Sequence, residues 1–233
     1  MSKPCAFKLQ SLREHIIGVE RVAKAFIEAS NLHRVAARRL GISNPELMRS
    51  YMLLATKAHD LGKAMEVYQN KFDDSCNPIN ERFDFVDHEV YSATILLAKK
   101  EEVMRAYGDC ELCFNSAVSA VLLHHHAMRV HDESEIKEKL EKYSLRPGKL
   151  VKDGLDEVIG FQLPESLRNR DLSRLASSIN AIYSSSARSY LYFLTPLVIA
   201  DYADSSKRKE SEKRTFSLIV LDILREWGVG IEG

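Results

Sequence analysis

The stretch from residue 54 to residue 63, Leu-Ala-Thr-Lys-Ala-His-Asp-Leu-Gly-Lys, places His59 and Asp60 side by side directly after an apolar run. A histidine and a carboxylate can bind one cation together, and the second carboxylate oxygen can bridge to another cation. Gly62 follows, and glycine readily adopts the left-handed conformation that ends helices. We therefore expect the His-Asp pair at a helix end that faces a cleft, and we interpret the rest of the chain around this point.

Apolar residues recur at helical spacing through most of the chain, which predicts an all-α fold. At 233 residues the chain is long enough to bury a full core, and we expect one domain over residues 1–233. No convincing strand alternation is present, although 144–163 has the glycine and proline content of a loop or short hairpin. Predicted helices cover 11–30, 31–40, 45–60, 64–70, 87–100, 113–127, 133–143, 167–188, 190–203 and 207–227.

The overall charge is balanced, with 33 basic and 33 acidic residues. A nucleic-acid substrate would therefore need a local basic patch or bound metal ions to attract its phosphates. The charged run at 207–214 is one candidate for such a patch, although a run of this kind is usually a solvated helix face. No phosphate-binding loop of the P-loop type is present, so the chain is not by itself a P-loop ATPase or helicase.

The four cysteines are interpreted as reduced thiols. The sequence contains no secretory leader pattern and no apolar run long enough to span a membrane, so we expect a cytoplasmic protein. Cys110 and Cys113 form a C-x-x-C pair without the second pair that a zinc ribbon needs. We interpret this pair as thiols at the start of a helix.

Two histidines on predicted helices are candidate ligands. His15 lies on the apolar face of its helix between Leu12 and Val19, where a lone histidine is more often a hydrogen-bonded core residue. His88 follows Asp87, an expected N-cap, and so lies in a first helical turn. The positive end of a helix keeps imidazole neutral and able to bind metal, although a solvent-facing histidine is the alternative.

Three successive histidines, 124 to 126, end an apolar predicted helix. Packing alone explains them poorly, because each buried ring nitrogen needs a partner. Asp201 shares a helix face with Leu197 and Leu194, and a carboxylate on such a face is costly unless a cation or donors meet it. Asp204 is expected to be a solvated residue at a helix end.

With two of the three successive histidines counted, these positions supply seven nitrogen or oxygen ligands from five helices, more than one ion usually takes from protein. Two ions bridged by Asp60 fit better, and imidazole with carboxylate suits Mn, Fe, Co, Ni or Zn more than an all-oxygen magnesium cage. Two ions roughly 3.5–4 Å apart can activate a shared water and bind phosphate oxygens. Lys63, one turn from Asp60, is positioned to neutralise charge on the phosphate, the alternative being a solvated lysine.

The order of these residues resembles the HD phosphohydrolase superfamily, and in more detail the stand-alone HD nuclease of type I CRISPR interference. The resemblance covers about residues 12 to 205. Its matching pieces are Leu12-x-x-His15, His59-Asp60-Leu61-Gly62-Lys63, His88 with Ser92 and Ala93, the doubled histidine, and Ala200-Asp201 with Ser205.

The resemblance implies an all-α HD-domain bundle with a dinuclear centre that hydrolyses single-stranded DNA in antiviral defence, with Asp60 and Lys63 as catalytic residues. It also implies a separate helicase and an RNA-guided surveillance complex as partners. The expected cofactors are two divalent transition-metal ions, Mn, Ni, Co or Fe, with Mg as an alternative. One ion is expected on His15, His59, Asp60 and Asp201, and the other on Asp60, His88, His125 and His126.

Two choices stay open at this point. His125 and His126 are preferred because a small residue, Ala127, follows them, and His124 is the alternative ligand. The alternative functions are an HD phosphohydrolase acting on nucleotides or cyclic dinucleotides, and a helical scaffold in which metals serve stability alone.

Overall fold

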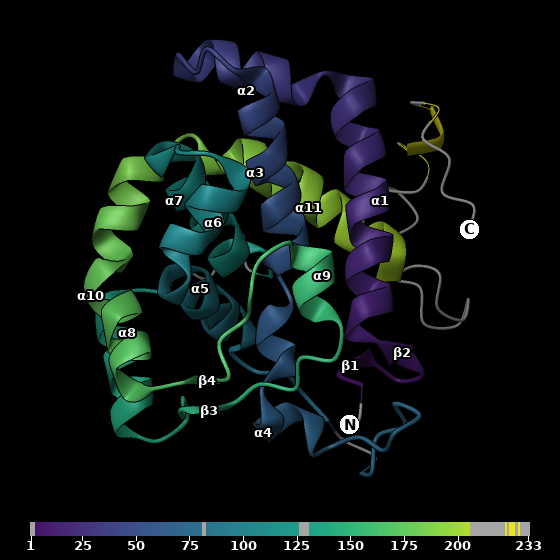
Figure 1. Ribbon diagram of the computed structural model, residues 1–233, viewed down its shortest axis with the longest axis vertical. Coiled ribbons are helices and arrows are strands. Elements are labelled where there is room, and N and C mark those ends of the chain that lie inside the picture. Colours follow the sequence, from purple (N-terminus) through teal and green to yellow (C-terminus); the bar gives the residue numbers. More distant parts are fainter. Residues whose placement is uncertain are drawn as a thin grey trace.

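A computed structural model describes residues 3–80, 83–125 and 131–205, together with 222, 224–226 and 228. Within these residues the predicted all-α fold is confirmed (Figure 1). No helix of this described part is long and apolar enough to cross a bilayer. His126 and nearly all of the helix predicted over 207–227, with its basic run, lie outside the described residues.

The helices follow one another with short connections. The long ones are α1 (Leu12–Ser30), α2 (Leu32–Leu40), α3 (Pro45–Ala58), α5 (His88–Ala98), α6 (Lys100–Tyr107), α7 (Glu111–Leu123), α8 (Glu133–Glu141), α10 (Asn169–Ser186) and α11 (Tyr190–Ser205). Between them lie a 3₁₀ turn, η1 (Leu61–Ala64), and two short helices, α4 (Glu66–Gln69) and α9 (Leu155–Ile159).

Local sequence sets the starts of the two helices that matter most for the site. Ser11 caps α1: its hydroxyl accepts the Glu14 N–H at 3.2 Å, and the Glu14 carboxylate accepts the Ser11 N–H at 2.9 Å. Asn44 caps α3 by accepting the Glu46 N–H at 3.0 Å, and Pro45 occupies the first helical position. Both helix starts agree with the sequence prediction.

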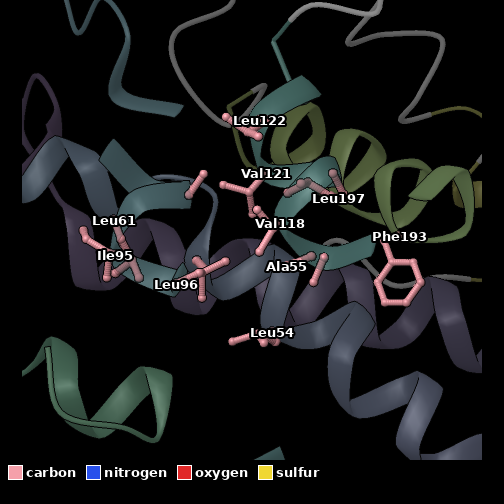
Figure 2. Close-up of a cluster of buried hydrophobic side chains, with 14 of the residues drawn as sticks. Leu54, Ala55, Leu61, Ile95, Leu96, Val118, Val121, Leu122, Phe193 and Leu197 are labelled. Atoms are coloured by element: carbon pink, nitrogen blue, oxygen red, sulfur yellow. The ribbon is translucent and has the colours of Figure 1, made fainter. Parts of the chain in front are cut away.

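The centre of the fold is formed by α3, α5 and α7, with α1, α10 and α11 packed around them. Figure 2 shows the apolar side chains at this centre, which come from α3, η1, α5, α7 and α11. Leu54, Ile95 and Val118 are fully buried there. Burying an aliphatic side chain stabilises the fold by roughly 1.5–3 kcal/mol, so this core fixes the helix ends that carry the polar site.

Two pairs of short antiparallel strands accompany the helices. Antiparallel β1 (Cys5–Phe7) and β2 (Gln10–Ser11) precede α1, and β3 (Gly148–Lys149) pairs with β4 (Ser166–Leu167). The sequence predicts a loop or short hairpin over 144–163, and of this strand pair β3 lies inside that segment and β4 just beyond it.

The expectation of reduced cysteines is wrong in this structure. Cys5 is bonded to Cys76, and Cys110 to Cys113. The first bond joins β1 to the loop after α4. Gln69, the last residue of α4, also contacts the Cys5 backbone: its Oε1 accepts the Cys5 N–H at 2.7 Å, and its Nε2 donates to the Cys5 carbonyl at 3.0 Å. The second lies within the first turn of α7, where residues three apart face one another.

Candidate metal centre

Asp60 lies at the centre of the polar site, directly after α3 and before η1. Its side chain is 1% exposed, and basic groups from several helices surround its two carboxylate oxygens. Around Oδ2 lie His59 Nε2 at 3.4 Å, His15 Nε2 at 3.1 Å and Lys63 Nζ at 2.7 Å. The expected meeting of distant helices at the His-Asp pair is therefore present.

One side of the site combines imidazole and carboxylate groups from three helices. His15, fully buried on α1, lies with Nε2 3.4 Å from Asp201 Oδ1 of α11. His59 Nε2 lies 3.7 Å from the same oxygen. Ligand atoms of His15, His59 and Asp60 lie close enough together to hold one metal ion, and Asp201 faces the same point.

The other side of the site is rich in imidazole. His88 Nε2 lies 2.9 Å from Asp60 Oδ1, and His124 Nε2 lies 3.8 Å from it. His125 Nε2 is 3.0 Å from His88 Nε2. Ligand atoms of these three histidines and Asp60 form a second group that could hold an ion. His125 is in the predicted place, and His124, the alternative of the sequence analysis, also belongs to this group.

Three of the imidazoles around Asp60 are held by a hydrogen bond on their outer nitrogen. Nδ1 of His59, His88 and His124 lies 2.8, 2.6 and 2.6 Å from the carbonyl oxygen three residues earlier. A carbonyl only accepts, so Nδ1 donates, and Nε2 is the nitrogen that faces Asp60 and is available to a metal ion. This is the arrangement that metal-binding histidines usually show.

Five buried atoms at this point make no hydrogen bond of good geometry: Nε2 of His15, His59 and His124, and both oxygens of Asp60. Buried polar atoms without well-formed hydrogen bonds are uncommon and costly. Here three imidazole nitrogens and a carboxylate converge on one point, and all of them can donate lone pairs to divalent cations. The donor set therefore fits the predicted metals.

The electrostatics of the two sides differ. Burial alone would lower the pKa of His15, but the nearby carboxylates of Asp201, Asp204 and Asp60 outweigh it and raise this pKa to about 10. On the other side, burial and the neighbouring His124 and His88 lower the pKa of His125 to about 2. Carboxylates thus dominate the surroundings of His15, and burial among other imidazoles dominates those of His125.

Lys63 is buried, not solvated. Its Nζ contacts Asp60 Oδ2 and lies 3.9 Å from the ring centroid of Phe7 and 5.0 Å from that of Phe85. The two rings and the carboxylate hold the ammonium group beside the site. The solvated alternative for Lys63 does not apply.

Gly62 serves a different purpose from the one predicted. It lies inside η1 and is not among the glycines with left-handed backbone. A Cβ atom at Gly62 would lie 2.0 Å from the backbone oxygen of His88 and 2.8 Å from Tyr91 Cβ. Its N–H donates to Ser92 Oγ at 2.7 Å, so glycine here allows η1 and α5 to approach closely.

Two acidic residues behave differently from the sequence interpretation. Asp87 does not cap α5 with its side chain: it adopts φ 65° and pairs with Lys139 at 2.5 Å. Asp204 is 4% exposed and lies 2.9 Å from His15 Nδ1, so the expectation of a solvated residue is wrong. Its position three residues after Asp201 on one helix was the available signal.

A further buried group was missed. His131 Nε2 contacts Glu89 Oε1 at 3.1 Å, and Glu89 Oε2 lies 3.4 Å from His88 Nδ1. Burial raises the pKa of Glu89, but the His131 hydrogen bond and the nearby His88 outweigh it and hold this pKa well below its usual range. Lys139 bridges Asp87 and Glu135 beside this group, which neutralises part of its negative charge.

Comparisons relate the chain to known proteins. Residues 3–199 match the family model described as Cas3, HD domain. The chain is 31% identical over 239 residues to the CRISPR-associated endonuclease Cas3-HD of Saccharolobus solfataricus, covering 95% of this chain and 96% of that protein. A protein of the same description from Methanocaldococcus jannaschii is 26% identical over 229 residues, covering 88% and 89%. The solved structure of a Cas3 HD domain protein from Methanocaldococcus jannaschii shares the fold, with a TM-score of 0.61 at 21% identity over 86% of this chain and all of that one.

Proposed function

Because the chain belongs to the Cas3 HD-domain family, we propose that it is a CRISPR-associated nuclease that hydrolyses phosphodiester bonds of single-stranded DNA with two divalent cations. Two relatives that carry the description of endonuclease match nearly the whole chain, which supports nuclease activity. DNA as the substrate and two cations as the cofactor are the finer parts of the proposal.

The observation that carries the proposal is the convergence of imidazole nitrogens on Asp60, with five buried atoms that lie close to one another but make no hydrogen bond of good geometry. A scaffold would join such atoms by well-formed hydrogen bonds or replace them with apolar side chains, because poorly satisfied buried polar groups destabilise the fold. Divalent cations would bind these atoms together. The cluster therefore supports a role beyond stability.

We assign the first cation to His15, His59, Asp60 and Asp201, as the resemblance implied. We assign the second to Asp60, His88, His124 and His125, since these residues form one group in the described part of the chain. His126, preferred from the sequence, lies outside the described residues. The imidazole-rich donor set favours Mn, Fe, Co or Ni over Mg.

When bound, such a cation pair supplies an activated water and neutralises phosphate oxygens. The protein groups have separate tasks. Asp60 offers one oxygen to each side of the site. Lys63 holds a positive charge beside Asp60, where it would offset the negative charge that develops on phosphate. The carbonyl contacts to Nδ1 keep three imidazoles oriented toward Asp60.

DNA supply is the second part of the proposal. The balanced charge of the chain gives no general attraction to nucleic acid. We therefore propose that a separate helicase and an RNA-guided surveillance complex deliver the displaced single strand to this site. The cations, in this view, provide the local positive charge.

Cleavage assays with metal-free protein reconstituted with Mg²⁺, Mn²⁺, Co²⁺, Ni²⁺ or Zn²⁺ test which substrate the protein hydrolyses. We expect cleavage of single-stranded DNA that is lost in Asp60→Asn and strongly reduced in Lys63→Gln, with Lys142→Gln, an exposed lysine, as the matched control. Circular strands distinguish internal cleavage from cleavage at ends. Turnover of cyclic dinucleotides or nucleotides without DNA cleavage would contradict the proposal.

A further inference from the structure

The support of His15 differs from that of the other buried ligand candidates. His59 and His124 directly follow α3 and α7, and His88 opens α5. The Nδ1 of each lies within hydrogen-bond distance of the backbone carbonyl three residues earlier. His15 is the fourth residue of α1, inside the helix. Its Nδ1 instead meets a side chain of another helix.

That side chain is Asp204. Its Oδ2 lies 2.9 Å from His15 Nδ1, and both side chains are buried. Asp201, one turn earlier on α11, has its Oδ1 3.4 Å from His15 Nε2. A single helix therefore places a carboxylate against each nitrogen of one imidazole, and only the carboxylate of Asp201 lies on the side of Asp60.

The surroundings of Asp204 keep its carboxylate in this place. Gln10 Nε2 donates to Asp204 Oδ2 at 3.2 Å. A Cβ atom on Gly18, which lies three residues after His15 on α1, would come within 2.1 Å of Asp204 Oδ1. The absence of a side chain at Gly18 gives Asp204 the room it needs beside α1.

We infer that Asp204 is a positioning residue that fixes the ring and the tautomer of His15, so that the Nε2 lone pair faces the first cation. A carboxylate that accepts from Nδ1–H also makes Nε2 a stronger donor than a carbonyl does. The inference rests on the proposed metal centre. It adds that the two cations have unequal support, because Nδ1 of His15 lies closest to a carboxylate, whereas Nδ1 of His88 and His124 lies closest to a backbone carbonyl.

The test compares Asp204→Ala and Asp204→Asn with the wild type, and uses Asp153→Ala, an exposed aspartate, as the control. Metal-free protein is titrated with Mn²⁺ by calorimetry and with Co²⁺ by visible absorption, which reports the ligand geometry. Urea denaturation in the presence of a chelator measures the free energy of unfolding without the contribution of bound metal.

We expect Asp204→Ala to weaken one of the two Mn²⁺ sites by roughly 10- to 100-fold, the usual effect of removing such a supporting group. The Mn²⁺ affinity of Asp204→Asn should lie between those of the wild type and Asp204→Ala, because the amide oxygen still accepts from His15 Nδ1–H but carries no charge. The second site and the Asp153→Ala control should keep wild-type affinity.

Wild-type affinity at both sites in Asp204→Ala would overturn the inference, and so would equal weakening of both sites. Should Asp204→Ala fail to fold, Asp204→Asn decides, since unchanged affinity there also overturns it. A wild-type protein that binds no Mn²⁺ would instead contradict the proposed function, and this inference with it.

Discussion

Gly62→Ala offers a quantitative test of how the His-Asp motif is built. The added methyl group would lie 2.0 Å from the His88 carbonyl oxygen, 2.9 Å from its carbon and 2.8 Å from Tyr91 Cβ. An ordinary contact needs roughly 3.5 Å, so η1 and α5 must separate by more than about 1 Å. The obstructing atoms include backbone, which cannot rotate away.

Two effects add in this variant. Overpacking of this kind destabilises by about 1–3 kcal/mol. Separation also breaks the buried bond from Gly62 N–H to Ser92 Oγ, and a buried amide left unpaired costs about 1–3 kcal/mol. We therefore expect the free energy of unfolding to fall by about 3 kcal/mol or more. Because His88 is the residue displaced, Mn²⁺ affinity should fall as well.

Urea denaturation followed by circular dichroism in a chelator measures the first effect, and calorimetric titration with Mn²⁺ measures the second. Gly148→Ala is the matched control, because its methyl group would meet only the flexible end of Met65 at 3.2 Å. We expect that control to change stability by less than about 1 kcal/mol. A Gly62→Ala protein within 1 kcal/mol of the wild type would refute the close-approach argument.

Three further predictions concern the supports of the site. Asn44→Ala removes the cap of α3 and should reduce the free energy of unfolding by about 1 kcal/mol with Mn²⁺ affinity unchanged, and a loss of affinity alone would contradict this. The Cys5–Cys76 bond closes a separation of 71 residues, so the double serine variant should lose about 4 kcal/mol in urea denaturation, more than the Cys110–Cys113 variant with its separation of 3. The backbone N–H groups of Asn77 and Ser75 donate to the Asp73 carboxylate and hold its pKa below the usual value. The ionised carboxylate therefore stabilises the folded protein fully at pH values above the pKa that Asp73 has in the unfolded chain. This contribution is lost as the pH falls through the lower pKa of the folded protein. A carbon NMR titration of Asp73 with a midpoint at or above that of a free aspartate would exclude this support.

The helices were predictable because their apolar periodicity and caps are local signals. Ser11, Asn44 and Pro45 mark helix starts, and the structure places those starts as expected. The meeting of His15, His59, Asp60, His88 and Asp201 was also foreseeable, since buried polar residues on separate helices need common partners. Their role as metal ligands remains a prediction.

The errors concern relations between segments that sequence spacing does not reveal. Asp204 lies one turn after Asp201, but it was interpreted as solvated because the approach of α1 through Gly18 is a contact between distant segments. Cys5 and Cys76 lie too far apart in sequence for their pairing to be read locally. His124 joins the site because α7 ends at Leu123, and helix ends are the least certain feature of a sequence pattern.

Anomalous scattering from crystals grown with Mn²⁺ tests the central claim most directly. The account predicts two peaks that share Asp60, one in contact with His15, His59 and Asp201 and the other with His88, His124 and His125. A single peak, or peaks away from Asp60, would contradict it.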